Sequence, residues 1–378
     1  MTQIKKDSCV PVYKQLGQVL RQQWSAGRLR PGDRIPSENE LCRRFDISRM
    51  TARAALLELE KEGWVSSVLG KGRFVKAEGS GRAEQSKDTS SLTVAVYPFF
   101  NVSPATTFYF SGLLNGLARG FHHHRVRSTF FREEEIRASS LSRHAFFTRN
   151  GVDGLIWGSP SRRERLEIQA LENEGLPVVV LNEDGGPYGL DYVTCNHHQG
   201  ARQMTEHLIH LGHRAIGCLT VSRDLDYAER RWQGYTDAHT HNGLSADPRL
   251  TVQIDDLTRQ DRIDRQVGEH LARLKSSGPW PTAWFIASGA MVPGITRFVQ
   301  TEGLSVPGDL SLAAFDEVTP EPGYAKITCV RQPLEALGET AVDVLVKKIR
   351  GKKAKPVQIT LDPVFILGSS CLPLSKRP

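Results

Sequence analysis

The sequence predicts an α/β protein in which a small, mostly helical head precedes a larger body built on parallel sheets. In residues 9–76, apolar residues recur at helical spacing and are followed by two short runs of β type. From Leu92 onward, short apolar runs alternate with helical stretches, the pattern of strand–helix–strand units with parallel pairing. Between these regions, residues 77–91 contain no aromatic or branched apolar side chain. They are expected to form a flexible linker that spans about 20 Å.

Capping residues mark the helices of the head. An amphipathic run from Pro11 to Trp24 predicts the first helix. Ser37 stands three residues before Glu40, and this capping box predicts a second helix over about 38–45. Ser48 is placed to cap a third helix. The buried stripe of that helix is expected to comprise Ala52, Ala55, Leu56 and Leu59.

The second and third helices predict a helix-turn-helix whose later helix lies in the major groove of DNA. Arg49 and Arg53 fall on the face opposite the apolar stripe, and an arginine fork pairs with guanine O6 and N7 or holds a phosphate. Ser48 and Thr51 are expected to donate to phosphates near the helix N-terminus. The runs 64–68 and 73–75 predict a hairpin wing, and Lys71 at its tip is expected to enter the minor groove or follow its backbone.

The net positive charge of the chain is concentrated in the head. Residues 1–78 contain 15 Lys and Arg against 9 Asp and Glu, so most of the formal net charge of +7 lies there. The rest of the chain is nearly neutral. This distribution indicates a polyanionic partner that meets the head alone.

Four motifs of the head resemble those of the GntR family of DNA-binding domains: residues 11–15, 29–41, 48–53 and 70–74. The resemblance covers residues 9–76 and implies a winged helix-turn-helix that binds a double-stranded DNA operator. The family positions that contact DNA match Ser48, Arg49, Thr51, Arg53, Asn39 and Gly70. Asn39 departs from the arginine that some members of the family carry at that position.

The body shows a repeated strand-and-helix pattern that predicts a doubly wound architecture. Candidate strands begin at Leu92, Gly154, Val178, Ala215, Thr282 and Leu310. About 285 residues of this pattern exceed one ordinary sheet and predict two lobes. Ligands bind beyond the carboxyl ends of parallel strands, so facing lobes form a cleft that can close.

The body resembles the LacI/GalR sensor domain over residues 92–373. The matching segments keep that family's order and spacing, and they are 192–200, 206–214, 231–235, 306–311, 314–317 and 330–338. This sensor is a two-lobed, periplasmic-binding-protein-like α/β domain. Together, head and body resemble regulators of the AraR type, in which a GntR head is joined to such a sensor.

The resemblance implies an effector site in the cleft, where Arg231 and Asp316 bind the effector through polar contacts. A guanidinium donates to vicinal hydroxyls and a carboxylate accepts from them, which suits a sugar. By position, further cleft residues are expected to be Asn182, Gln332, Phe108 and Tyr109. The family's Ala-Asn-Asp segment appears here as Ala287-Ser288-Gly289. Ser288 is therefore expected to make a single hydroxyl contact in place of the usual amide and carboxylate.

The resemblance also implies a homodimer that binds a palindromic operator. An apolar stripe lies on the helix predicted before Gly351, and it comprises Leu334, Leu337, Ala341, Val342, Leu345 and Ile349. The matching helix of the family lies at the dimer interface, but core packing explains the stripe equally well. Both interpretations stay open at the level of the sequence.

The function expected from the resemblance is a cytoplasmic transcription regulator, a repressor whose operator affinity is controlled by a sugar. Two alternatives are a solute-binding or sugar-processing protein with a vestigial head, and a DNA-binding regulator without effector response. No known catalytic motif occurs, so an enzyme is not expected. The six scattered cysteines form no CxxC pair, and neither a metal nor another cofactor is expected. No apolar run reaches the roughly 18 residues of a membrane helix, so no membrane partner is expected.

Overall fold

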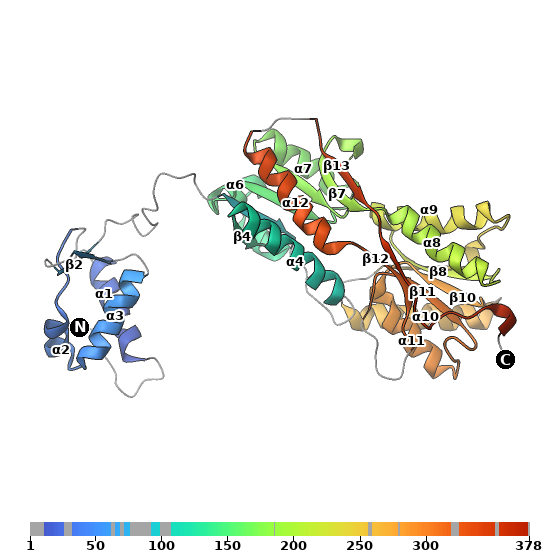
Figure 1. Cartoon of the computed structure of the whole chain (residues 1–378), viewed down its shortest axis with the longest axis horizontal. Helices are drawn as coiled ribbons and strands as arrows, with labels where there is room; N and C mark the ends of the chain where they lie inside the picture. The colour runs from blue at the N-terminus through green and yellow to red at the C-terminus, as the bar shows by residue number, and fades with distance from the viewer. Residues whose placement is uncertain are drawn as a thin grey trace. The chain divides into compact units, whose positions relative to one another are not determined.

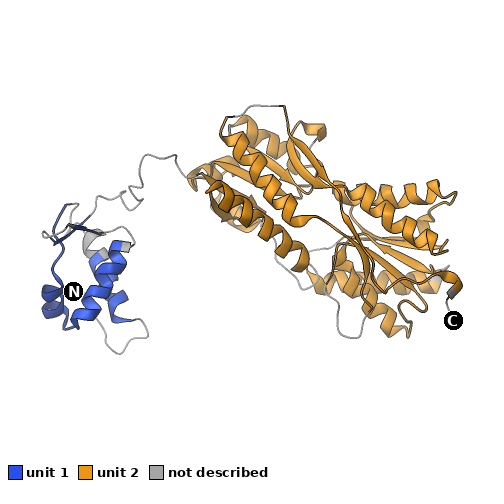
Figure 2. Ribbon diagram, viewed as in Figure 1, with its two compact units in different colours: residues 1–90 blue, residues 91–378 orange. Residues whose placement is uncertain are grey.

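The chain folds into two units that divide between residues 90 and 91 (Figure 2). The computed structural model describes residues 11–25, 32–61, 65–68, 72–75, 92–98, 107–184, 186–255, 259–278, 280–318, 325–351 and 355–376. The head lies in the first unit and the body in the second.

The head has the predicted order of helices followed by a hairpin. Its described elements are α1 (Val12–Ser25), α2 (Glu38–Phe45), α3 (Arg49–Lys61), β1 (Val65–Val68) and β2 (Gly72–Val75). The capping box is confirmed, because the Glu40 amide donates to Ser37 Oγ and the Ser37 amide donates to Glu40 Oε2. The predicted stripe of α3 is also confirmed, since all four of its residues are at most 2% exposed.

The strands β1 and β2 pair antiparallel and close the core of the head. Their register places Val65 opposite Val75, and both side chains are buried with Leu16, Leu41 and Ile35. A backbone bridge also joins residues 34 and 74. The predicted hairpin is therefore present, whereas its tip lies outside the described residues.

The first lobe of the body is built on a six-stranded sheet in the order β13-β7-β6-β5-β3-β4. These strands are β3 (Thr93–Tyr97), β4 (Arg127–Phe130), β5 (Gly154–Gly158), β6 (Val178–Leu181), β7 (Asp191–Cys195) and β13 (Gln358–Leu361). All of the described pairings in this sheet are parallel. The helices of this part are α4 (Thr107–His124), α5 (Glu133–Ser139), α6 (Arg143–Arg149), α7 (Glu164–Asn173), η2 (Gly186–Tyr188) and α12 (Leu334–Ile349).

The second lobe repeats this plan with the order β14-β12-β11-β10-β8-β9. Its strands are β8 (Ile216–Val221), β9 (Thr251–Ile254), β10 (Ala283–Ile286), β11 (Ser311–Phe315), β12 (Thr328–Arg331) and β14 (Val364–Ile366). Among the described pairings of this sheet, that of β12 with β14 is antiparallel and the others are parallel. The helices are α8 (His197–His210), α9 (Asp226–His241), η3 (Pro248–Leu250), α10 (Gln260–Ser277), η4 (Gly289–Met291), α11 (Val292–Thr301) and η5 (Leu374–Lys376).

The chain passes between the two lobes where β7 leads to α8, where β12 leads to α12, and where β13 leads to β14 (Figure 1). Two of these passages are hydrogen-bonded to each other, because Asn196 Nδ2 donates to Asp362 Oδ1 at 3.0 Å. The carboxyl ends of both parallel sheets therefore face one interlobe region, as the sequence predicts.

The apolar stripe of α12 belongs to the core of the first lobe. Leu337, Ala341, Val342 and Leu345 are fully buried, and α12 packs along α4 and over β5, β6 and β7 (Figure 1). Gly120 of α4 allows this approach, since a Cβ there would lie 2.7 Å from Val342 Cβ. These four residues are covered by their own chain, so core packing accounts for their burial, and the expected dimer interface stays a prediction.

Candidate functional site

The first turn of α3 presents its polar side chains outward on a well-capped helix. The Thr51 amide donates to Ser48 Oγ at 3.1 Å, and the two hydroxyls lie 2.8 Å apart. The side chains of Arg49 and Arg53 are 73% and 61% exposed. Met50 between them is 75% exposed. The structure thus brings four of the predicted DNA-binding residues to one helix end.

Glu38 of α2 orients the arginines of this surface. Its carboxylate lies 3.3 Å from Arg49 Nε, 3.9 Å from Arg53 Nε and 3.4 Å from Arg73 Nη1. Partial burial acts to raise the pKa of Glu38, but the hydrogen bonds from Arg49 and Arg73 outweigh it and the pKa is lowered. Glu38 therefore stays ionised. The sequence interpretation treated it only as part of the cap segment.

Asn39, another predicted DNA-binding position, is not part of this cluster. Asn39 is exposed on α2, and its carbonyl oxygen accepts a hydrogen bond from Arg43 Nε. Gly70 and Lys71 lie outside the described residues, so their predicted roles at the wing tip stay predictions.

Replacing Glu38 with glutamine is expected to strengthen binding to random duplex DNA. The carboxylate neutralises part of the charge of three arginines, so its removal increases their attraction to phosphates. The slope of log affinity against log salt concentration should become steeper by up to about one. A titration at several salt concentrations measures this slope, and an unchanged slope would contradict the assigned role of Glu38.

In the body, Arg231 of α9 is the centre of a buried polar cluster. It is 2% exposed, and its Nη1 donates to the carbonyl oxygen of Ala287 at 2.6 Å. The same atom lies 3.5 Å from Asp316 Oδ2. The guanidinium carbon lies 3.6 Å from the centre of the Phe315 ring. Residues from α9, β11 and the end of β10 thus fix the guanidinium, and the predicted pair of Arg231 and Asp316 is brought together.

Asp316 and Gln332 follow neighbouring parallel strands and meet at their carboxyl ends. Gln332 Nε2 donates to Asp316 Oδ1 at 2.6 Å. Gln332 is 3% exposed, and its Oε1 is buried without a hydrogen-bond donor among the described residues. The backbone of Asp316 is left-handed, with φ of 79°. The structure therefore places an amide oxygen ready to accept a hydrogen bond beside the carboxylate.

Asn182 supplies a similar amide from the first lobe. It follows β6 with φ of 65°, is 5% exposed, and donates from Nδ2 to the Tyr109 hydroxyl at 3.0 Å. Its Oδ1 is buried without a donor in the described part of the chain. Burial raises the pKa of Tyr109, with a further contribution from Asp316, so the phenol stays protonated. Phe108, the other candidate for ring stacking, is 43% exposed.

The Ser288-Gly289 segment lies beside Asp316. A Cβ added at Gly289 would lie 3.2 Å from Asp316 Cβ and 2.9 Å from Val318 Cγ1. Ser288 is half-buried at the start of η4. The glycine thus provides room for this close approach, and the loop cannot hold a larger residue at 289 without a local shift.

Sequence reasoning missed Tyr227 and His197, which both contact Arg231. The Arg231 guanidinium carbon lies 4.8 Å from the Tyr227 ring centre. Tyr227 is one helical turn before Arg231, so the i, i+4 spacing was a usable signal. The Nδ1 atom of His197 lies 3.3 Å from both Nε and Nη2 of Arg231. No local pattern links these two residues, because the contact joins α8 to α9.

A buried ionic cluster joins the two lobes next to this site. Arg165 of α7 forms an ion pair with Asp226 at the start of α9, and its Nη2 lies 3.7 Å from Glu183 Oε2. Glu183 is fully buried and accepts from the Tyr227 amide at 3.1 Å. Burial, with a contribution from Asp226, raises the pKa of Glu183 to about 8.

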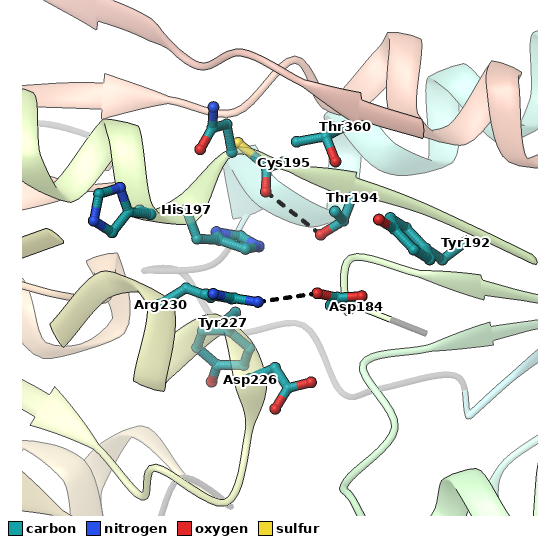
Figure 3. Close-up of a pocket in the computed structure, with 11 residues that line it drawn as sticks. Asp184, Tyr192, Thr194, Cys195, His197, Asp226, Tyr227, Arg230 and Thr360 are labelled. Carbon is teal, nitrogen blue, oxygen red and sulfur yellow. Dashed lines mark hydrogen bonds and ion pairs between the residues drawn. The ribbon is translucent and has the colours of Figure 1, made fainter. Parts of the chain in front are cut away.

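A cavity of about 200 Å³ opens beside these groups (Figure 3). Asp184 of the first lobe and Arg230 of the second form an ion pair across it at 3.2 Å. Tyr192, Asp226 and Tyr227 also line the cavity. None of the residues predicted to bind an effector lines it, but His197 and Tyr227, which contact Arg231, do, so the cavity adjoins the cluster around Arg231.

Raising the pH from 6.5 to 8 is expected to destabilise the body through Glu183. The native carboxyl keeps a proton that the unfolded chain, with a pKa of 4.5, has already released. The proton therefore adds to the free energy of unfolding in full below pH 4.5. That contribution falls by about 1 kcal/mol for each pH unit as the pH rises from there towards 8.

Thermal or denaturant unfolding of wild type and Glu183→Gln across this range measures the difference. The variant should lack this part of the slope, and Glu206→Gln on α8 should keep it. Parallel curves for wild type and Glu183→Gln would contradict the raised pKa.

The head and the body of the chain each match a known protein family. Residues 12–75 match the bacterial regulatory proteins of the gntR family, and residues 205–371 match the periplasmic-binding-protein-like domain. The chain joins a GntR-family domain to a periplasmic-binding-protein-like domain. The predicted resemblance is confirmed, and the mixed α/β fold with parallel sheets is confirmed with it.

Several known proteins are similar to this chain over most of its length. It is 25% identical over 374 residues to an arabinose metabolism transcriptional repressor of Geobacillus stearothermophilus, which covers 97% of this chain and 99% of the relative. A LacI family regulator from Mycobacterium smegmatis superimposes with a TM-score of 0.62 at 24% identity, over 75% of this chain and 99% of that one.

The complex of the regulator CelR with cellobiose gives a TM-score of 0.64 at 21% identity, over 89% of this chain and all of that one. At these identities the two solved structures establish the fold.

Two other kinds of site are absent from the described residues. Among those residues, no group of three or more His, Cys, Asp or Glu side chains is placed to hold a metal ion. No helix in the described ranges is long and apolar enough to span a bilayer.

Proposed function

We propose that this chain is a sequence-specific DNA-binding transcription repressor whose operator affinity is controlled by a sugar bound between the lobes of the body. The observation that carries the proposal is the presence, in one chain, of an exposed arginine helix and a buried polar cluster. Arg49 and Arg53 are presented outward, whereas Arg231 is held among ligand-type groups. The full-length similarity to a named repressor supports the same conclusion.

The polar cluster is suited to a neutral, unphosphorylated sugar. The positive charge of Arg231 is offset by Asp316 at 3.5 Å, and the other predicted contacts carry neutral amides and a phenol. A phosphate group requires cations that are free to pair with it, and the cluster itself supplies none. Asn182 Oδ1 and Gln332 Oε1 have no donor among the described residues, and sugar hydroxyls provide such donors. The relative named for arabinose metabolism makes L-arabinose the first sugar to test.

A sugar panel tests this proposal directly. An operator duplex is first selected from a random library with the full chain, and the panel then contains L-arabinose, D-xylose, D-ribose, D-galactose, cellobiose and phosphate esters of these sugars. A neutral sugar should raise the melting temperature and release the operator. Binding of phosphate esters alone would overturn the ligand class. Operator binding that no sugar alters would identify a DNA-binding regulator without effector response.

We also propose that the chain acts in the cytoplasm as a homodimer on a palindromic operator. A single winged helix reads one half-site, and two-fold pairing adds the energies of two half-sites. The buried stripe of α12 leaves other surfaces of the body for this contact. Sedimentation of the full chain with and without a palindromic duplex tests the proposal, and one chain bound per duplex would contradict it.

A further inference from the structure

His197 occupies an unusual position for a buried imidazole. It is the first residue of α8, directly after the chain has passed from the first lobe at Asn196. It is 4% exposed, and its ring centre lies 5.6 Å from that of Phe315 and 5.9 Å from that of Tyr227. The ring is therefore enclosed by the same aromatic residues that enclose Arg231.

The contact between His197 and Arg231 fits only one protonation state of the imidazole. Nε and Nη2 of the guanidinium both carry hydrogens, and both lie 3.3 Å from His197 Nδ1. Arginine offers only donors, so Nδ1 has to be the acceptor and the ring proton has to reside on Nε2. Burial and the charge of Arg231 lower the pKa of His197 well below its ordinary value, against the effect of a backbone hydrogen bond with Asn182. The imidazole is neutral.

The other contacts of Arg231 leave this edge of the guanidinium to His197. Nη1 is engaged by the Ala287 carbonyl oxygen and lies nearest Asp316. The face of the guanidinium rests on the Phe315 ring. Nε and Nη2 would have no other acceptor among the hydrogen bonds of the described chain if the imidazole were removed. The guanidinium plane would then be fixed at one nitrogen instead of three.

We infer that His197 is the positioning residue of the effector site, a neutral acceptor that sets the plane in which Arg231 meets a sugar. The part of this inference that concerns the sugar rests on the proposed function. The contact itself does not, because it is present in the chain without any ligand. His197 on α8 and Arg231 on α9 both belong to the second lobe, so their contact is set within that lobe.

Two substitutions separate an acceptor from a space-filling group. In His197→Asn the side-chain oxygen stands close to the place of Nδ1 and accepts from Arg231, whereas His197→Leu fills much of the same space without an acceptor. His197→Leu is expected to weaken binding of the panel sugar roughly 10- to 100-fold, the effect of a lost hydrogen bond to a charged group. His197→Asn should stay within about threefold of wild type, because it restores that acceptor. His198→Leu, next along α8 and paired with Asp237, is the matched control and should bind as wild type does.

A double-mutant cycle shows whether the effect passes through Arg231. His197→Leu and His197→Asn are made in wild type and in Arg231→Ala, and the melting temperature of each full-length protein is measured without ligand. The difference between the two His197 variants should be present beside arginine and vanish beside alanine. An equal difference in both backgrounds would overturn the positioning role.

The ligand-free double-mutant cycle and the sugar-binding measurement test different parts of the proposal. Coupling in the ligand-free cycle with no sugar bound by wild type would remove the proposed effector class and leave the contact standing. Sugar binding by wild type that is equal in His197→Leu would overturn the positioning role and leave the proposed function standing. The pH profile gives a third measure, since a neutral imidazole predicts that wild-type sugar affinity does not fall as the pH is lowered from 7 to 6.

Discussion

Arg231→Ala is expected to abolish the response of operator binding to sugar while leaving operator binding without sugar intact. The variant removes the guanidinium that lies between Ala287 and Asp316, and it leaves the Asp316 carboxylate without its cation. Loss of charge-assisted hydrogen bonds in a buried site should weaken sugar binding more than about 100-fold. Isothermal titration with the panel sugar and operator release on the same samples measure both effects.

Arg202→Ala is the control for this experiment, because Arg202 forms a side-chain ion pair within α8 and is 38% exposed. It should respond to sugar as wild type does. The head lies in a separate unit, so Arg231→Ala should bind the operator normally when no sugar is present. A normal sugar response in Arg231→Ala would remove Arg231 from the effector site.

Arg53→Ala is expected to weaken operator binding severely. The side chain is 61% exposed on α3, with its Nε 3.9 Å from Glu38 Oε1, and an arginine fork can pair with a guanine edge or a phosphate. A bidentate contact with a base contributes about 1–3 kcal/mol, so the loss for each half-site is roughly 5- to 150-fold. A titration at fixed salt concentration, with random duplex as competitor, measures the loss.

Comparison with the random duplex also shows whether Arg53 contacts a base or a phosphate. Loss of a base contact lowers affinity for the operator more than for random duplex, whereas loss of a phosphate contact lowers both equally. Arg249→Ala in the body, whose exposed side chain pairs with Asp247, should leave both affinities unchanged. Wild-type operator affinity in Arg53→Ala would refute the role of this arginine.

Local signals in the sequence predicted the head and the central strands well. The Ser37 capping box and the stripe of α3 depend on neighbours three and four residues apart, so both are visible in the chain itself. The strands β5, β6, β10 and β11 are fully or almost fully buried, and each appears as a continuous apolar run.

The strands of the body that the sequence did not reveal are β4, β7, β9, β12, β13 and β14, and apart from the very short β14 none of them is a continuous apolar run. β4 is mostly exposed, and β13 and β14 are short edge strands with exposed positions. Their pairing is set by the sheet that they extend and not by their own composition.

In the effector site of the body, some residues could also be predicted from the sequence, whereas others depend on contacts between distant elements. Arg231, Asp316, Asn182 and Gln332 were placed by resemblance, and they converge because each follows or faces the carboxyl end of a parallel strand. His197 and Glu183 were missed because their roles arise from contacts between elements distant in the chain. No periodicity within α8 or after β6 contains that information.

The left-handed backbone at Asn182 and Asp316 limits how this site can change during evolution. Both residues have positive φ, a conformation that asparagine and aspartate tolerate and that β-branched side chains adopt only with strain. Drift at these two positions is therefore restricted to exchange between amide and carboxylate, or to glycine. New ligand preferences in descendants of this chain should arise first at the neighbours with ordinary dihedral angles, while these two positions change last.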